Sequence, residues 1–408
     1  MGSEAVELKD NPYQTEEGWV NVKLIKEETK VVAYISGARN IGKTYGFLKE
    51  AVENSLNAFL KENPIISSDD ILELPKVSTS KWQFLFLRRY QTQSGEAKSK
   101  ELIKEKFYEE FGNNLDKHRI LKDYRLYVDY VGSKESIQEI HLVMENKKNK
   151  KKKRRIMMGY IGAISMVEKF RQSGYENVQE IYFDEFQAKR TWDYYKDDAT
   201  GKTEPYFLMD IYESVTRERA GQVKLFCFGN SDSILNPHFP YYGYDEFDQV
   251  KTEKRNGTVV FFHLKNIAPN KAKGSAFHDL IAGTAYGDYS INNAYGDEET
   301  FNVIRLREAK KPRKCKYNIR LGADKFGVWS DGENHTILSR LLEPEKRTFV
   351  DGIPKGKEVL DISTFELMAS LIKNRYLFFD TPDIRLIAEK HLIKYIFKGA
   401  KDEWKTFS

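Results

Sequence analysis

Apolar residues in the first 264 positions alternate between short continuous runs and helix-spaced stretches. Four mostly apolar runs, typical of strands buried on both faces of a sheet, lie at residues 31–35, 82–87, 178–183 and 223–228. Helical spacing follows two of these runs, at residues 47–56 and 206–215. This order of strands and helices predicts an α/β domain with a central, mostly parallel sheet and helices on both faces.

The remaining third of the chain has a different pattern. Residues 265–299 are richer in Gly, Asn, Ala and Lys and contain no long apolar run, as expected for a linker with a short helix. Strand-like runs resume after residue 300, and an amphipathic helix at 384–397 closes the chain. We therefore predict a first domain at 1–264, a linker at 265–299 and a smaller α+β domain at 300–408.

Two stretches of the first domain carry no predicted chemistry. Residues 1–30 have the pattern of a polar arm that leads to the first strand. Residues 63–80 contain two prolines and several Ser and Asp, which favours a surface insertion.

The composition indicates a folded protein of a reducing compartment. The 408 residues include 25 Phe, 24 Tyr and 5 Trp, which argues against disorder despite 31% charged residues. The only two cysteines, Cys227 and Cys315, are far apart and exclude a disulfide framework. No signal peptide and no run of eighteen apolar residues is visible, so neither secretion nor a membrane span is expected.

The positive charge is concentrated in one segment. Eight basic residues fall within positions 147–155, and without them the net charge of +5 would be −3. Strand-like runs flank this segment, which predicts a β-hairpin with a long basic tip. Unpaired like charges oppose regular structure, so we expect the tip to be mobile until an anion binds it. The residues expected to contact DNA are Lys150, Lys151, Lys152, Lys153, Arg154 and Arg155.

The segment from Gly37 to Thr44, GARNIGKT, matches the phosphate-binding loop pattern G-x-x-x-x-G-K-S/T. A strand precedes it and a helix follows, as that loop requires, because amide groups at a helix N-terminus bind phosphate oxygens. Lys43 would reach the β- and γ-phosphates of ATP, and Thr44 would hold Mg²⁺. The residues expected to surround the nucleotide are Gly37, Ala38, Arg39, Asn40, Ile41, Gly42, Lys43, Thr44 and Tyr45.

A second motif ends the run at 178–183 with two carboxylates, Asp184 and Glu185. Paired with a phosphate-binding loop, this is the Walker B pattern. Asp184 would complete the Mg²⁺ shell with Thr44, and Glu185 would orient and deprotonate the attacking water. The run at 223–228 ends at Asn230, which we expect beside the γ-phosphate, although a turn asparagine is the alternative. An additional strand and a catalytic glutamate (ASCE type) distinguish such ATPases from kinase-like proteins.

The ordered set of motifs resembles one family. The strings that carry the resemblance are GARNIGKT, FLFLRRYQT, YENVQEIYFDEF, VTRER, LFCFGN, NPHFPYYGYDEF and LIAGTAYGDYSINN. They are similar to the DNA-packaging ATPases of phi-29-like phages, which resemble the ATPase part of terminase large subunits. The similarity runs from the phosphate-binding loop to the C-terminus.

The resemblance implies an ATP-driven motor that moves double-stranded viral DNA into a procapsid. It implies a homomeric ring, with a pentamer expected, at the portal (connector) vertex in the host cytoplasm. It leaves open whether a structural RNA takes part. It also implies that Arg217 is an arginine finger for the neighbouring subunit, with Arg219 as its rival, and that Arg171 faces that subunit.

For the last domain the resemblance implies a vestigial RNase-H-like nuclease. An active nuclease would need several carboxylates around two metal ions. The equivalent strands offer Asp324, Asp331 and Asp380, two of them in turn-like contexts. We therefore expect no nuclease activity.

Three other functions fit the sequence less well. A cellular helicase or partition-type ATPase would also use the phosphate-binding loop, but helicase motifs are not visible. A nucleotide-gated scaffold would not need both Lys43 and Glu185. A structural metal site is disfavoured because no two of the seven His are three or four residues apart.

Overall fold

The structure is a computed structural model, which describes residues 11–37, 41–63, 68–90, 123–133, 137–171, 174–188, 193–197, 200–219, 221–230, 236–244, 249–264, 314–330, 336–374, 376–380 and 382–397. The described strands form one sheet of nine strands and one of six. The mixed α/β class and the parallel-rich first sheet are as predicted. The predicted linker at 265–299 lies outside the described residues.

The large sheet has the strand order β3-β4-β5-β2-β6-β7-β1-β9-β8. Its six central strands, from β5 to β9 in that order, run parallel, and antiparallel strands flank them at both edges. The strands are β1 (Val32–Gly37), β2 (Val77–Arg88), β3 (Tyr124–Val131), β4 (Gln138–Asn146), β5 (Lys153–Ala163), β6 (Val178–Asp184), β7 (Lys224–Asn230), β8 (Lys251–Lys254) and β9 (Val259–His263). Strand β7 separates β1 from β6, so an additional strand lies between the two motif-bearing strands, as predicted.

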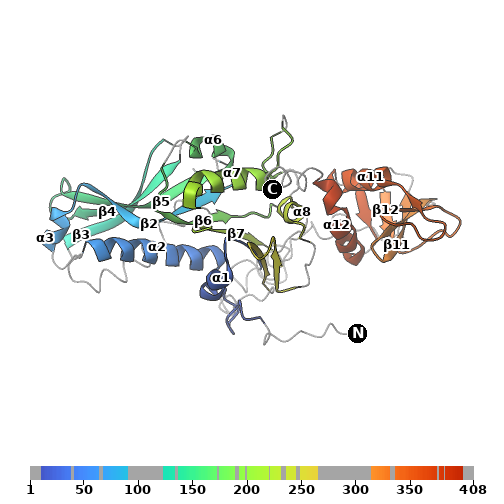
Figure 1. Ribbon diagram of the computed structural model, residues 1–408, viewed down its shortest axis with the longest axis horizontal. Coiled ribbons are helices and arrows are strands. Elements are labelled where there is room, and N and C mark those ends of the chain that lie inside the picture. The colour runs from blue at the N-terminus through green and yellow to red at the C-terminus, as the bar shows by residue number, and fades with distance from the viewer. Residues whose placement is uncertain are drawn as a thin grey trace, which may run out of the picture.

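Helices cover both faces of this sheet because successive side chains of each strand point to opposite sides. Ala33 and Ile35 pack with the buried face of α2, whereas Val32 and Tyr34 pack with α7 and α8. Figure 1 shows α2 along one side of the sheet and α6 and α7 along the other. The helices of this part are α1 (Val22–Glu28), α2 (Lys43–Glu62), α3 (Ser68–Glu73), α6 (Val167–Phe170), α7 (Glu204–Thr216) and α8 (His238–Tyr242), with 3₁₀ turns at Ile164–Met166 and Arg217–Arg219.

Three expectations for this part were wrong. The polar arm contains α1, whose Ile25 is fully buried and whose first turn is capped by the Asn21 side chain. The predicted insertion at 63–80 contains α3 and the first residues of β2. Lastly, three residues of the basic run, 153–155, belong to β5, because cross-strand partners neutralise them.

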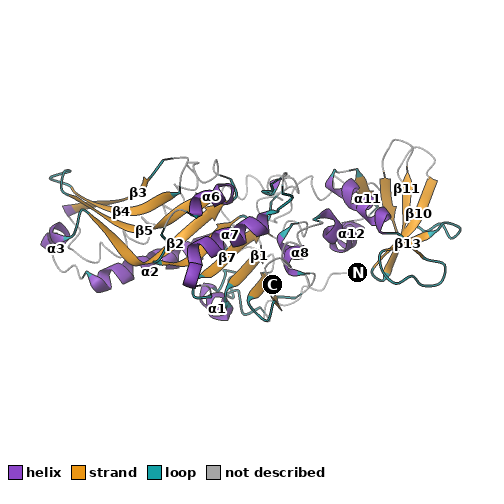
Figure 2. Cartoon of the chain, turned by 45° about the horizontal axis from the view of Figure 1, so that its top comes forward, coloured by secondary structure: helices purple, strands orange, loops and turns teal. Residues whose placement is uncertain are grey.

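The six-stranded sheet has the order β14-β13-β10-β11-β12-β15. Its strands are β10 (Lys314–Leu321), β11 (Asp324–Ser330), β12 (Thr336–Ser339), β13 (Thr348–Val350), β14 (Val359–Leu360) and β15 (Leu377–Phe379), and its helices are α11 (Ile362–Lys373) and α12 (Pro382–Ile396). Figures 1 and 2 show this sheet and its two helices at one end of the long axis. The apolar stripe of α12 is core, as predicted, with Ala388 and Leu392 fully buried.

Candidate active site

The chain leaves β1 at Gly37 and enters α2 at Lys43, with Gly42 as the N-cap. Gly42 has φ +82°, a left-handed conformation that glycine adopts without strain. A Cβ on Gly37 would lie 2.8 Å from Cβ of Leu264, so only glycine fits there. Ala38, Arg39 and Asn40 lie outside the described residues. The two described glycines thus bring the backbone into a sharp turn at a helix N-terminus, the arrangement that suits an anion.

Lys43 and Thr44, the first two residues of α2, point toward the carboxyl edge of the sheet. The Lys43 ammonium is buried and donates to the Gly37 carbonyl at 2.8 Å. The Thr44 hydroxyl donates to Oδ1 of Asp184 at 2.8 Å. Asn230 ends β7 and pairs in register with Gly37, which places it at the same edge. The two predicted motifs, 140 residues apart, therefore meet as expected.

Arg88, the last residue of β2, joins the two carboxylates of the second motif. Its guanidinium lies 3.2 Å from Oδ2 of Asp184 and 3.1 Å from Oε2 of Glu185. Burial raises the pKa of Asp184, Arg88 opposes that rise, and the neighbouring Glu185 adds to it. The Glu185 side chain is 55% exposed, so it can meet a ligand approaching the edge from solvent.

The donor set at Thr44 and Asp184 fits a magnesium ion. Both groups present oxygen atoms, and Mg²⁺ binds oxygen ligands in an octahedron of about 2.0–2.1 Å radius. Neighbouring corners of such an octahedron lie about 2.9 Å apart. The observed separation of 2.8 Å between the two oxygens matches this spacing.

Glu185 has φ +62°, one of four described non-glycine residues with positive φ. Such a conformation is costly for a residue with a Cβ and persists only where surrounding contacts impose it. Here Phe186 N donates to the Phe228 carbonyl at 2.9 Å, which ties the turn to β7. The buried Arg89 guanidinium donates to the Glu185 and Phe186 carbonyls at 2.6 and 3.1 Å.

Arg217 lies at the opposite edge of the sheet from these groups. Helix α7 starts near Glu185 and runs back for 13 residues, about 20 Å, to end beside the start of β6. Arg217 follows this helix with φ +44° and is exposed. Its position therefore separates it from the phosphate-binding loop of its own chain by about the length of β6.

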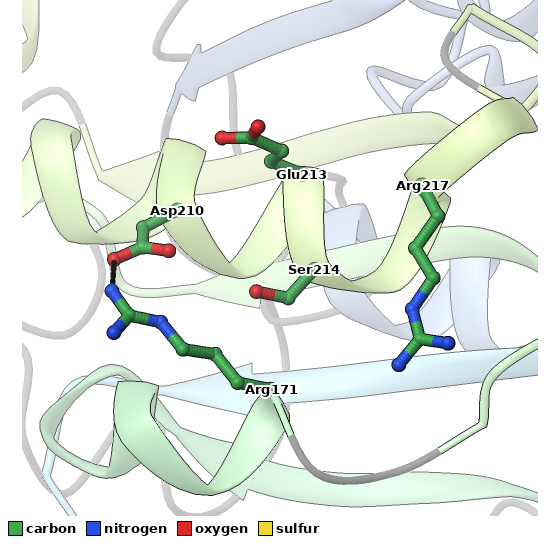
Figure 3. Close-up of a pocket in the computed structure, with 5 residues that line it drawn as sticks. All are labelled: Arg171, Asp210, Glu213, Ser214 and Arg217. Carbon is green, nitrogen blue, oxygen red and sulfur yellow. Dashed lines mark hydrogen bonds and ion pairs between the residues drawn. The ribbon is translucent and has the colours of Figure 1, made fainter.

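Arg217 and Arg171 line the same surface groove, of about 570 Å³, with Asp210, Glu213 and Ser214. Figure 3 shows both arginines projecting from neighbouring elements, one after α6 and one after α7. Arg171 forms ion pairs with Asp210 at 2.7 Å and with Glu168 at 2.9 Å.

Arg219, two residues further on, has a different environment from Arg217. It donates to the carbonyls of Val178, Tyr175 and Val215 at 2.7–3.2 Å. These main-chain bonds fasten the end of α7 to the start of β6.

The basic segment forms the predicted hairpin between β4 and β5, with a connection at 147–152. The expectation that clustered charges prevent order was wrong. Asn146 accepts from the amides of Lys148 and Asn149, and Asn149 accepts from that of Lys151. Arg155 pairs with Asp129 at 2.7 Å, and Arg154 donates to the Leu72 carbonyl. Lys150, Lys151 and Lys152 are exposed, whereas Lys153, Arg154 and Arg155 are partly buried.

The candidate carboxylates of the second sheet do not converge. Asp324 pairs with Arg340 at 3.2 Å, and Asp380 accepts from the Ser339 hydroxyl at 2.7 Å. Asp331 lies outside the described residues. No group of three His, Cys, Asp or Glu that could hold a metal occurs among the residues that the structure describes. In the same part of the chain, no helix is long and apolar enough to cross a membrane.

Comparison with protein-family models gives one match, the Podovirus DNA encapsidation protein (Gp16) family, over residues 134–395. The chain belongs to this family. It is therefore a member of a phage DNA-encapsidation family, and the resemblance deduced from its motifs is confirmed. The matched range contains Asp184, Glu185 and Arg217 but begins after the phosphate-binding loop. No curated protein matches the chain.

Three solved structures have related chains. "The Phi-28 gp11 DNA packaging Motor" is 16% identical, with a TM-score of 0.45 over 94% of this chain and 99% of that one. "The bacteriophage Phi-29 viral genome packaging motor assembly" is 19% identical, with a TM-score of 0.41 over 93% and 99%. The N-terminal domain of the phi29 DNA packaging ATPase is 18% identical, with a TM-score of 0.36 over 62% and 96%.

Sequence reasoning placed the two motifs but missed the residues that support them. Arg88 and Arg89 were visible as a polar end to an apolar strand, a signal for a ligand-binding rim. Their separate partners were not visible, because Asp184 and Glu204 lie about a hundred residues further along the chain.

Proposed function

We propose that this encapsidation protein is an ATP-driven motor that moves double-stranded DNA into a procapsid. The observation that carries the proposal is the contact between Thr44 and Asp184, with Lys43, Arg88 and Glu185 at the same sheet edge. This set combines a phosphate-binding helix N-terminus, two oxygen ligands and an exposed carboxylate. It is the combination that ATP hydrolysis by a P-loop ATPase of the ASCE type requires.

In this mechanism each residue has one task. Lys43 leaves the Gly37 carbonyl and binds the β- and γ-phosphates of ATP. Mg²⁺ bound by Thr44 and Asp184 neutralises phosphate charge. Glu185 accepts a proton from the water that attacks the γ-phosphate, while Asn230 contacts that phosphate. Because Arg88 binds Glu185 in the structure, the glutamate must exchange this partner for water before hydrolysis.

The second half of the site comes from the neighbouring subunit. Arg217 lies about 20 Å from the Glu185 of its own chain, so it suits a role in trans. Arg219 is engaged with three carbonyls, which favours Arg217 as the finger. Arg171 shares the groove with Arg217 and would face the same neighbour. This arrangement favours a homomeric ring, and we propose a pentamer.

The partners follow from this function. Double-stranded DNA would meet the exposed lysines of the hairpin, through phosphates and without sequence preference. The portal (connector) protein, alone or with a structural RNA, would anchor the ring in the infected cell. We assign ATP hydrolysis to a domain at 1–264, and a vestigial RNase-H-like role to 300–408 after the linker at 265–299. Asp324 and Asp380 bind separate partners, in keeping with the absence of nuclease chemistry.

The test is ATP turnover with double-stranded DNA. Glu185→Gln should lower kcat by about 10²–10⁴-fold, the usual contribution of a general base. Arg217→Ala should be inactive alone. Mixing Arg217→Ala with Lys43→Ala chains should restore some turnover, because intact half-sites then meet at some interfaces. Full turnover by Glu185→Gln would refute the proposed mechanism, and no recovery in the mixture would refute the trans assignment.

A further inference from the structure

A buried polar network lies directly behind the candidate active site. The Arg89 guanidinium binds both carboxylate oxygens of Glu204, at 2.5 and 3.2 Å. Glu204 also contacts Nε2 of His238 at 3.0 Å, and Nδ1 of His238 contacts the Tyr34 hydroxyl at 3.0 Å. The network therefore joins the end of β2, the start of α7, α8 and the middle of β1, the strand that leads to the phosphate-binding loop.

The charges of this network are balanced. Burial would raise the pKa of Glu204, but Arg89 and the His238 hydrogen bond hold it below its usual value. Burial lowers the pKa of His238, so the imidazole is neutral at pH 7. The hydrogen bonds assign its proton to Nε2, which donates to Glu204, while Nδ1 accepts from Tyr34. One buried cation thus faces one buried anion.

Arg89 also makes bonds that the ion pair alone does not need. Its Nη2 donates to the carbonyls of Glu185 and Phe186, at 2.6 and 3.1 Å. These carbonyls belong to the turn in which Glu185 has φ +62°. The guanidinium is held flat by its fork on Glu204 and by the ring of Tyr194, 5.1 Å from its centre. It is therefore a rigid donor directed at the backbone of the strained residue.

We propose that Arg89 is a positioning residue that fixes the main chain of Glu185, and that Glu204 and His238 hold Arg89 for this purpose. The inference rests on the proposed function of Glu185 as general base. A buried ion pair adds little stability compared with apolar residues of similar size. A guanidinium is required here because no apolar side chain can donate to the two carbonyls.

The primary test replaces Arg89 with lysine, which keeps the charge but cannot bind Glu204 and both carbonyls at once. Arg89→Lys should lower kcat for ATP by about ten- to hundredfold, the cost of a catalytic group displaced by about 1 Å. The KM for ATP, and the affinity and stoichiometry for a non-hydrolysable ATP analogue, should stay within threefold. Unchanged kcat in this variant would overturn the proposal.

A second variant guards against loss of the fold. Arg89→Met with Glu204→Gln removes both charges and leaves an acceptor for His238, so no buried charge is left uncompensated. It should bind the analogue with one site per chain and lose kcat as Arg89→Lys does. The matched control is Arg320→Met with Glu358→Gln, which neutralises the bidentate pair of the six-stranded sheet and should keep kcat. If the Arg89 double variant retained kcat, the positioning role would be excluded.

Combination with Glu185→Gln separates positioning from general damage. If Arg89 acts through Glu185, adding Arg89→Lys to Glu185→Gln should change the residual single-turnover rate by less than twofold. A further ten- to hundredfold loss would show a role independent of Glu185 and overturn the inference. Full activity of Glu185→Gln alone would instead refute the proposed function, so the two failures are distinct.

Discussion

Both sheets carry carboxylates at strand termini, but only the large sheet gathers them into a site. Asp184 ends a parallel strand and meets Thr44, Arg88 and Glu185 within 3.2 Å or through its neighbour in sequence. In the six-stranded sheet, Asp380 ends β15 and binds Ser339, whereas Asp324 starts β11 and binds Arg340. The large sheet concentrates charge at one edge, and the smaller sheet disperses it.

The cause of this difference is topological. In the large sheet β1, β6 and β2 are parallel, so their carboxyl ends and the start of α2 lie at one edge. In the smaller sheet β10, β11 and β12 alternate in direction, so Asp324 and Asp380 terminate strands in different contexts. A terminal aspartate is a turn residue unless the topology brings further ligands to it.

The largest effect expected from this comparison is on hydrolysis. Asp184→Asn should lower ATP turnover by at least about 100-fold, because metal-assisted charge stabilisation contributes several kcal/mol. The matched change in the other sheet, Asp380→Asn, should leave turnover within twofold. Steady-state turnover over a range of Mg²⁺ concentrations measures both. Equal losses in the two variants would contradict the division of roles between the sheets.

A smaller effect is expected for Arg88. Arg88→Ala removes the cation shared by Asp184 and Glu185, which leaves two like charges adjacent. We expect kcat to fall about tenfold, with binding of a non-hydrolysable ATP analogue changed by less than threefold. Arg340→Ala, which removes the ion pair of Asp324, is the control and should have no effect on kcat. Wild-type kcat in Arg88→Ala would show that the bridge is dispensable.

The parts of the site that the sequence predicted are those set by local pattern. GARNIGKT follows an apolar strand and precedes a helix, and Asp184 and Glu185 end a strand, so each motif is recognisable within about twenty residues. The parallel class and the strand between β1 and β6 follow from strands alternating with helices.

The remaining features depend on contacts between distant segments. Glu204 lies 115 residues from Arg89, and nothing in the intervening sequence indicates that they pair. The basic run was misjudged for the same reason, since Asp129 and the Leu72 carbonyl, which neutralise Arg155 and Arg154, come from other elements. The short helix α1 was missed because its apolar residues fill less than two turns.

The hairpin offers a third comparison, between exposed lysines of the two regions. Replacing Lys147, Lys148, Lys150, Lys151 and Lys152 with Gln should lower affinity for double-stranded DNA and reduce the slope of log K against log salt by as much as about 4, at about 0.9 per phosphate contact. The same change at Lys314, Lys316, Lys325, Lys346 and Lys355 of the smaller sheet is the control. Fluorescence anisotropy at several salt concentrations measures the slope. An unchanged slope in the hairpin variant would remove it from the DNA path.

The smallest effect concerns the stability of the six-stranded sheet in acid. Hydrogen bonds from Lys325 and Arg320 lower the pKa of Glu358 to about 2. A carboxylate with a depressed pKa stabilises the fold above its unfolded pKa, about 4.3, and this contribution is lost as the pH falls toward 2. Hydrogen-exchange protection of residues 314–360 should therefore fall between pH 5 and pH 3, while that of β1 should not fall through this pair.

Glu358→Gln isolates that contribution. The variant cannot ionise, so protection of residues 314–360 should be lower than wild type at pH 5 and should converge with it near pH 2. The expected direction is fixed by the depressed pKa, since a raised one would give convergence at high pH instead. Parallel curves for wild type and Glu358→Gln would show that Arg320 and Lys325 hold this edge of the sheet without their shared carboxylate.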